Sequence, residues 1–134
     1  MFGFGDAQDN YNEIQNAPEE HKAKFSHELL AGGASFAAFK AFEDHQRNEG
    51  KPVSHQFAKE LLAGFAGAEV DKLAEGTGRN WVDKEEREHA HRKARENAEQ
   101  MYTNHYQGGD ANREGEWHPD NQAPDQIQDT FGRY

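Results

Sequence analysis

The sequence predicts an all-α protein: a small three-helix domain in which two repeated Ala/Gly-rich helices pack as a hairpin beside a charged third helix, with irregular N- and C-terminal segments. Two observations lead to this prediction. A Phe-x-x-Glu-Leu-Leu-Ala-Gly pattern occurs twice, beginning at Phe25 and again at Phe57. Glycine and proline residues divide the chain after each copy, as they do where helices end.

The first helix is expected over residues 18–48. Pro18 suits the first turn of a helix, because the missing backbone N–H would have no partner there. Gly50 is expected to end this helix, and Pro52 cannot continue it. The first 18 residues offer Tyr11 and Ile14 as apolar anchors.

The second helix is expected to begin after Ser54, whose side chain can cap it, and to end near residue 75, before Gly76-Thr77-Gly78. The third helix is expected over residues 84–107, with Asp83 as its cap. Three glutamates follow within five residues of Asp83, near the positive end of the helix dipole. These two helices complete the expected helical domain, which spans residues 1–107.

Residues 108–134 form a separate polar tail by composition. Gly, Asp, Asn, Gln and Pro are frequent here, and the bulky apolar residues are Trp117, Ile127, Phe131 and Tyr134. Two alternatives follow from this composition: the tail is disordered, or it lies along the helices and is pinned by Trp117 and Phe131.

The repeat gives the first two helices the same face, with an aromatic residue, a leucine one turn later and then a glycine. A glycine inside a helix costs about 1 kcal/mol relative to alanine. We therefore expect these glycines to permit close packing between helices. The residues expected at this packing and interface surface are Phe25, Leu29, Gly32, Gly33, Phe36, Phe39, Phe57, Leu61, Gly64, Phe65 and Ala68.

Self-association is expected because the first helix is apolar on more than one side. Between Leu29 and Phe42 only Lys40 is charged, and a helix of this kind must be covered on several sides. A second protomer, giving a homo-oligomer and most simply a dimer, would supply the cover. The alternative is that the N-terminal segment and the tail supply it within a monomer.

Composition limits the classes of partner. The formal net charge of −10 repels phosphate groups and anionic lipids, so no nucleic-acid partner is expected. No stretch has the ~20 apolar residues of a membrane span. The chain has no cysteine, which excludes disulfides, thiolate metal sites and a cysteine nucleophile. A soluble, cytoplasmic protein is the expectation.

Metal binding is the second functional hypothesis, because the chain has eight histidines. No two histidines are three or four residues apart, the spacing that helical chelation needs. Glu86 and His89 form one Glu-x-x-His motif, and His45 is a further candidate ligand. A di-iron bundle needs two such motifs and two more glutamates, so no cofactor is expected.

No catalytic residues are expected. Ser26 and His27 are adjacent, as are Ser54 and His55, and adjacent residues of a helix point about 100° apart. Neither pair therefore predicts a triad. The repeated Glu28 and Glu60 are expected to form structural ion pairs if they are partly buried, and an acid/base pair is the alternative.

Four long strings stand out in the chain: Phe25-Ser26-His27-Glu28-Leu29-Leu30-Ala31-Gly32, Phe42-Glu43-Asp44-His45-Gln46-Arg47, Gly50-Lys51-Pro52-Val53-Ser54-His55 and the run from Phe57 to Leu73. These strings resemble the fungal CipC-like antibiotic-response family, a domain of unknown function. The resemblance covers approximately residues 1–107, and Phe2 and Phe4 stand where many relatives carry tryptophan. The family implies an association with stress and toxin exposure and supplies no catalytic residues.

The resulting expectation is a non-enzymatic, self-associating stress- or toxin-response protein of unknown molecular activity. The alternative is a helical protein that binds a metal or small ligand through His and Glu side chains.

Overall fold

The computed structural model describes residues 3–18, 26–76, 84–107 and 115–132. Within these residues there are five helices and one two-stranded antiparallel sheet, and the predicted all-α class is confirmed. The elements are α1 (Phe4–Asn16), α3 (His27–Glu49), β1 (Val53–Ser54), α4 (His55–Gly76), α5 (Lys84–Tyr106), β2 (Glu116–Trp117) and α6 (Asp125–Phe131).

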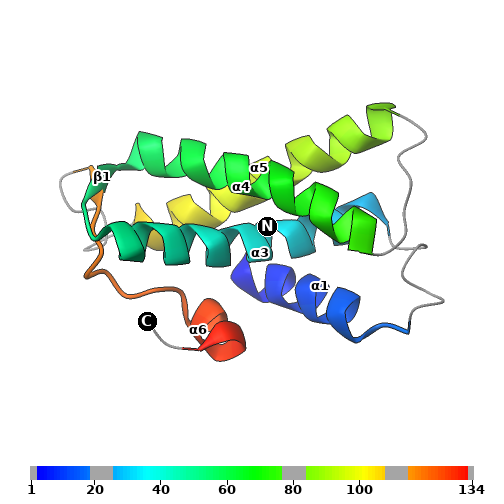
Figure 1. Ribbon diagram of the computed structural model, residues 1–134, viewed down its shortest axis with the longest axis horizontal. Helices are drawn as coiled ribbons and strands as arrows, with labels where there is room; N and C mark the ends of the chain where they lie inside the picture. Colours follow the sequence, from blue (N-terminus) through cyan, green and yellow to red (C-terminus); the bar gives the residue numbers. More distant parts are fainter. Residues whose placement is uncertain (1–2, 19–25, 77–83, 108–114, 133–134) are drawn as a thin grey trace.

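Helix α3 is the centre of the molecule. It packs against α4, α5, α1 and α6, and α4 also packs against α5. Figure 1 shows α3, α4 and α5 as three long helices, with α1 and α6 on the opposite side of α3 from α4. None of the helices in the described ranges has both the length and the apolar character required to cross a bilayer.

The prediction of irregular terminal segments is wrong for residues 4–16 and for the short elements β2 and α6. Helix α1 forms because Phe4, Ala7, Tyr11 and Ile14 recur at helical spacing and share one face. Ala7 and Ile14 are buried, and the other two are partly buried. The sequence prediction treated Tyr11 and Ile14 as isolated anchors and missed the helix that joins them.

Helix α3 begins at His27, so the prediction of one helix from Pro18 to residue 48 is also wrong. Ser26 has an extended backbone conformation, and its Oγ accepts a hydrogen bond from the Leu29 N–H at 3.1 Å. This cap starts a new helix at His27. Residues 19–25, which include the predicted packing residue Phe25, lie outside the described residues.

The turn between α3 and α4 follows local chemistry. Gly50 adopts a left-handed conformation with φ of 68°, and its N–H donates to the Gln46 carbonyl at 3.0 Å. The predicted helix end at Gly50 is thus confirmed. Ser54 Oγ accepts a hydrogen bond from the Phe57 N–H at 3.1 Å, which confirms Ser54 as the cap of α4. The predicted cap Asp83 lies outside the described residues.

Three phenylalanines of α3, Phe36, Phe39 and Phe42, are fully buried although they point in different directions. Their ring partners are Tyr11 and Phe131 for Phe36, Phe4 and Tyr106 for Phe39, and Tyr102 and Trp117 for Phe42. The N-terminal helix, α5 and the C-terminal segment of the same chain therefore cover α3, as the monomer alternative predicted. The apolar character of α3 gives no reason to expect a second protomer.

The C-terminal segment, residues 115–132, lies along the helices. Trp117 pairs with Val53 in the small sheet, and the His55 N–H donates to the Gly115 carbonyl at 3.0 Å. Trp117 and Ile127 are both fully buried in the main hydrophobic cluster. This segment therefore covers the end of the α3–α4 pair and contributes two of its core side chains.

The two repeats have different surroundings, and this difference predicts opposite effects of alanine. A Cβ on Gly32 would overlap the Asn10 side chain of α1, with Asn10 Cβ 3.2 Å away, whereas a Cβ on Gly64 would have no atom within 4 Å. We expect Gly32→Ala to lower the free energy of unfolding by about 1–3 kcal/mol through overpacking. Gly64→Ala should raise it by about 0.5–1 kcal/mol through helix propensity.

Urea denaturation of both variants at submicromolar protein concentration tests this contrast, with Gly64→Ala as the matched control. Equal effects of the two substitutions would show that Gly32 is not needed for the approach of α1.

Candidate functional site

A buried polar cluster joins α3 to α5. Glu43 is fully buried, and it accepts a hydrogen bond from Arg47 Nε at 2.7 Å and another from the Tyr106 hydroxyl. Glu43 and Arg47 face each other because they are four residues apart on α3. A buried carboxylate requires partners of this kind, because its desolvation is otherwise very costly.

Arg47 also holds the C-terminal segment. Its Nη1 donates to the Pro119 carbonyl at 2.6 Å, and its Nη2 donates to the Asn121 carbonyl at 2.8 Å. The guanidinium carbon lies 5.6 Å from the centre of the Trp117 ring, a cation–π distance. One side chain therefore links the buried Glu43 to the loop between β2 and α6.

The electrostatics of the cluster follow from its burial. Burial raises the pKa of the Glu43 carboxyl above its ordinary value, although Arg47 and Tyr106 act in the opposite direction. Burial also raises the pKa of the Tyr106 hydroxyl, and the charge of Glu43 adds to that effect. Since Glu43 has no exposed surface, a substrate would have no approach to it. The arrangement fits a structural network that orders the core.

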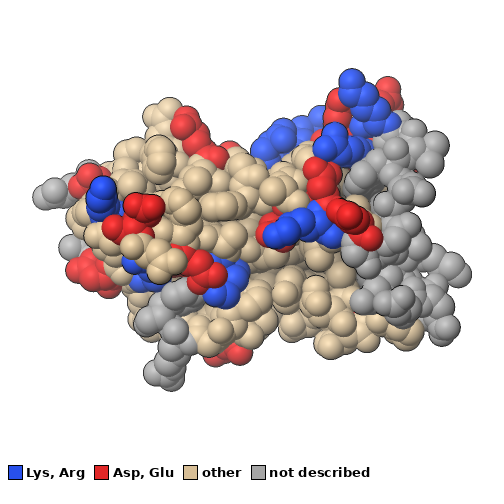
Figure 2. All heavy atoms as spheres, viewed as in Figure 1, with Lys and Arg blue, Asp and Glu red and all other residues tan. Residues whose placement is uncertain are grey.

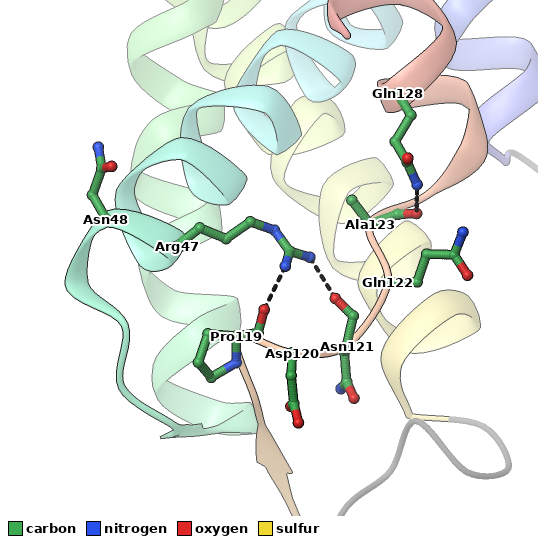
Figure 3. A pocket seen from close by; sticks show the side chains of 8 residues that line it. All are labelled: Arg47, Asn48, Pro119, Asp120, Asn121, Gln122, Ala123 and Gln128. Atoms are coloured by element: carbon green, nitrogen blue, oxygen red, sulfur yellow. Dashed lines mark hydrogen bonds between the residues drawn. The ribbon is translucent and has the colours of Figure 1, made fainter. Parts of the chain in front are cut away.

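A cavity of about 590 Å³ lies beside this cluster and is open to solvent. Figure 3 shows Arg47 at the cavity, with its guanidinium directed to the carbonyls of Pro119 and Asn121. The positively charged side chain that lines the cavity, Arg47, therefore binds the backbone of the C-terminal segment. The lining residues are Arg47, Asn48, Pro119, Asp120, Asn121, Gln122, Ala123 and Gln128.

The outer face of α4 is the second unusual feature. Phe57 is 50% exposed. Among the described residues it is the one large hydrophobic residue that is exposed. Gly64 and Ala68 are exposed on the same side of α4, and Leu61 and Phe65 flank them as partly buried residues. Figure 2 shows that the middle of the face formed by α3 and α4 carries few charged side chains.

A family model described as "Virulence factor CipC-like" matches residues 10–105, which is more than half of the chain. The chain belongs to the CipC-like family. The family resemblance predicted from the sequence is thereby confirmed. Neither the curated proteins nor the solved structures contain a significant match. The matched region of this CipC-like protein includes α3, α4 and most of α5, whereas Trp117 and α6 lie outside it.

Two of the three metal-ligand candidates of this CipC-like protein, Glu86 and His89, lie one turn apart on α5 and face the start of α3. Glu86 Oε2 lies 3.6 Å from His27 Nε2, and His89 Nε2 lies 3.9 Å from Glu28 Oε1. These cross-helix pairs join the start of α3 to α5. His45 lies near the other end of α3, where it contacts the Phe65 ring. Across the described part of the chain, no three His, Asp or Glu side chains are grouped as a metal site.

The repeated glutamates are not brought together. Glu28 lies at the start of α3, and its side chain is 68% exposed. Glu60 is exposed near the start of α4, which is adjacent to the end of α3, and its Oε1 accepts a hydrogen bond from Gln56 at 3.5 Å. Neither glutamate is buried, so the burial that both hypotheses for these residues required is absent. Glu43, which the sequence analysis did not select, is the buried acid of this protein.

The predicted interface residues fall into two groups. On α3, Gly32, Gly33, Phe36 and Phe39 are buried, and Leu29 is partly buried. The two glycines lie against α1, since added Cβ atoms there would meet Asn10 and Ile14. On α4 the predicted residues lie at or near the surface, namely Phe57, Leu61, Gly64, Phe65 and Ala68.

Proposed function

We propose that this CipC-like protein is a non-enzymatic component of a stress, toxin or virulence response that works by assembling with copies of itself. The exposed apolar side chains of α4 carry this proposal. Phe57 is half exposed and Ala68 is exposed, and contact with a second copy would remove them from water.

The observation rests on spacing as well as exposure. Phe57, Leu61, Gly64 and Ala68 follow one another at intervals of three or four residues and therefore occupy one side of the helix. Isolated apolar residues are common on protein surfaces, whereas a continuous row indicates a contact surface. The row also combines large and small side chains, so the large side chains of one copy can fit beside the small ones of an identical copy.

The surroundings of the acidic residues support the non-enzymatic part of the proposal. Glu43 is covered and held by Arg47 and Tyr106, which suits a structural role. Glu28 and Glu60 lie apart on exposed surfaces. Acid–base catalysis needs groups placed together within hydrogen-bond distance of a substrate. Glu43 is covered, and Glu28 and Glu60 lie on different parts of the surface.

Gly64→Arg is expected to weaken self-association at least about tenfold, equivalent to 1.4 kcal/mol or more. The folded chain should accept the arginine, because a Cβ at Gly64 meets nothing within 4 Å. Light scattering during size-exclusion chromatography measures the mass against protein concentration. The matched control is Asn12→Arg, which places the same side chain on an exposed position of α1.

The wild type and Asn12→Arg should both show twice the 15.2-kDa mass of one chain. Gly64→Arg should show the mass of one chain with an unchanged circular dichroism spectrum. If the wild type keeps the mass of one chain at protein concentrations up to about 100 µM, self-association with a dissociation constant below about 100 µM is refuted.

A further inference from the structure

Four exposed residues of α4 form a line with a distinctive order. Glu60, Gly64, Ala68 and Lys72 are all exposed and follow one another every four residues. This spacing places them in one row along the helix. Two small residues therefore lie between an acid and a base.

This order is self-complementary when a second α4 lies antiparallel to the first. If the two-fold axis passes midway between Gly64 and Ala68, Gly64 faces Ala68 of the second copy. The same axis places Glu60 opposite Lys72 of the second copy, and symmetry repeats each pairing. Within one helix, Glu60 and Lys72 are about 18 Å apart at 1.5 Å per residue, so they cannot pair in a monomer.

A parallel arrangement lacks this complementarity. It would place Glu60 opposite Glu60 and Lys72 opposite Lys72, and like charges in such positions repel each other. The charges of the row therefore select the antiparallel arrangement. The small side chains of Gly64 and Ala68 would also allow the helix axes to approach within the ~8–10 Å typical of packed helices.

The present contacts of the two charged residues are weak enough to be exchanged. Lys72 Nζ lies 3.5 Å from Glu69 Oε1, and the Lys72 side chain is 73% exposed. Glu60 accepts a 3.5 Å hydrogen bond from Gln56 at the surface. Exposed contacts of this kind contribute little to stability, so replacing them with contacts to a second copy costs little.

We infer that two copies of this chain meet through an antiparallel α4–α4 contact centred between Gly64 and Ala68, with reciprocal Glu60–Lys72 ion pairs. This inference rests on the proposed self-association and specifies its geometry. The occupant of the exposed face is a second copy, because the face is complementary in charge and in side-chain size to itself.

Charge reversal tests the arrangement. Glu60→Lys and Lys72→Glu should each weaken association at least about fivefold, since each places two like-charge pairs in the contact. The double variant Glu60→Lys with Lys72→Glu should recover association to within about twofold of the wild type. The matched control is Glu96→Lys, the same charge change at an exposed position of α5. Sedimentation velocity over a concentration series gives each dissociation constant.

The outcomes separate the inference from the proposed function. If the wild type is a monomer, the proposed self-association fails and the inference fails with it. If the wild type assembles and Gly64→Arg disrupts it, but the single reversals have no effect, self-association through α4 stands and the antiparallel register is overturned. If the reversals weaken assembly and the double variant does not recover, the Glu60–Lys72 pairing is likewise overturned.

Discussion

Glu43→Ala is expected to lower the free energy of unfolding by about 3–5 kcal/mol, the usual cost of breaking a buried ion pair. The substitution removes the acceptor for Arg47 Nε and for the Tyr106 hydroxyl. Arg47 would then lose the Glu43 carboxylate while still contacting Pro119 and Asn121. Urea denaturation followed by circular dichroism measures the loss.

The double variant Glu43→Ala with Arg47→Met is the control for the prediction. Removing both charges leaves no uncompensated ion, so the double variant should lose less than the sum of the two single variants. If the loss in the double variant equals the sum of the losses in the two single variants, the two side chains are not energetically coupled. A loss below about 1 kcal/mol for Glu43→Ala would contradict the role assigned to the cluster.

Trp117→Ala is expected to cost about 3–5 kcal/mol as a large-to-small core substitution. Trp117 is fully buried, and its ring contacts Phe42 and Tyr106. The variant would leave a cavity where the C-terminal segment joins the helices. The midpoint and slope of the urea transition measure the change.

Phe131→Ala is the comparison for Trp117→Ala, because Phe131 lies in the same C-terminal segment and is only partly buried. It should lose less stability than Trp117→Ala. If Trp117→Ala has the same urea midpoint as the wild type, the C-terminal segment does not contribute to the stability of the core.

The helix boundaries near Gly50 and Ser54 could be predicted because they depend on neighbouring residues. A glycine with φ of 68° ends α3, and a serine hydroxyl caps α4. The start of α3 was missed because Pro18 also satisfies the rules for a helix start, whereas the cap that operates is Ser26.

The repeat shows what local pattern cannot specify. Gly32 and Gly64 have the same position in the same motif, yet one lies against α1 and the other faces solvent. Helical periodicity identifies which residues share a face. It does not identify the element that covers that face, because this depends on tertiary packing.

The buried cluster was missed for a similar reason. Glu43 and Arg47 could have been recognised as a helical ion pair at a spacing of four residues. Tyr106, however, is 63 residues away in sequence, and its contact with Glu43 depends on how α3 and α5 pack. Trp117 lies in a polar stretch, so the sequence left open whether it pins this stretch to the helices. Its buried position shows that it does.

Native mass spectrometry of the wild type and Gly64→Arg at neutral pH is the direct test of self-association through α4, because one spectrum reports the number of chains in the particle. We expect a wild-type species at twice the 15.2-kDa chain mass and a Gly64→Arg species at the mass of one chain. Wild-type protein that remains a single chain, or a Gly64→Arg variant that assembles as the wild type does, would contradict self-association through α4.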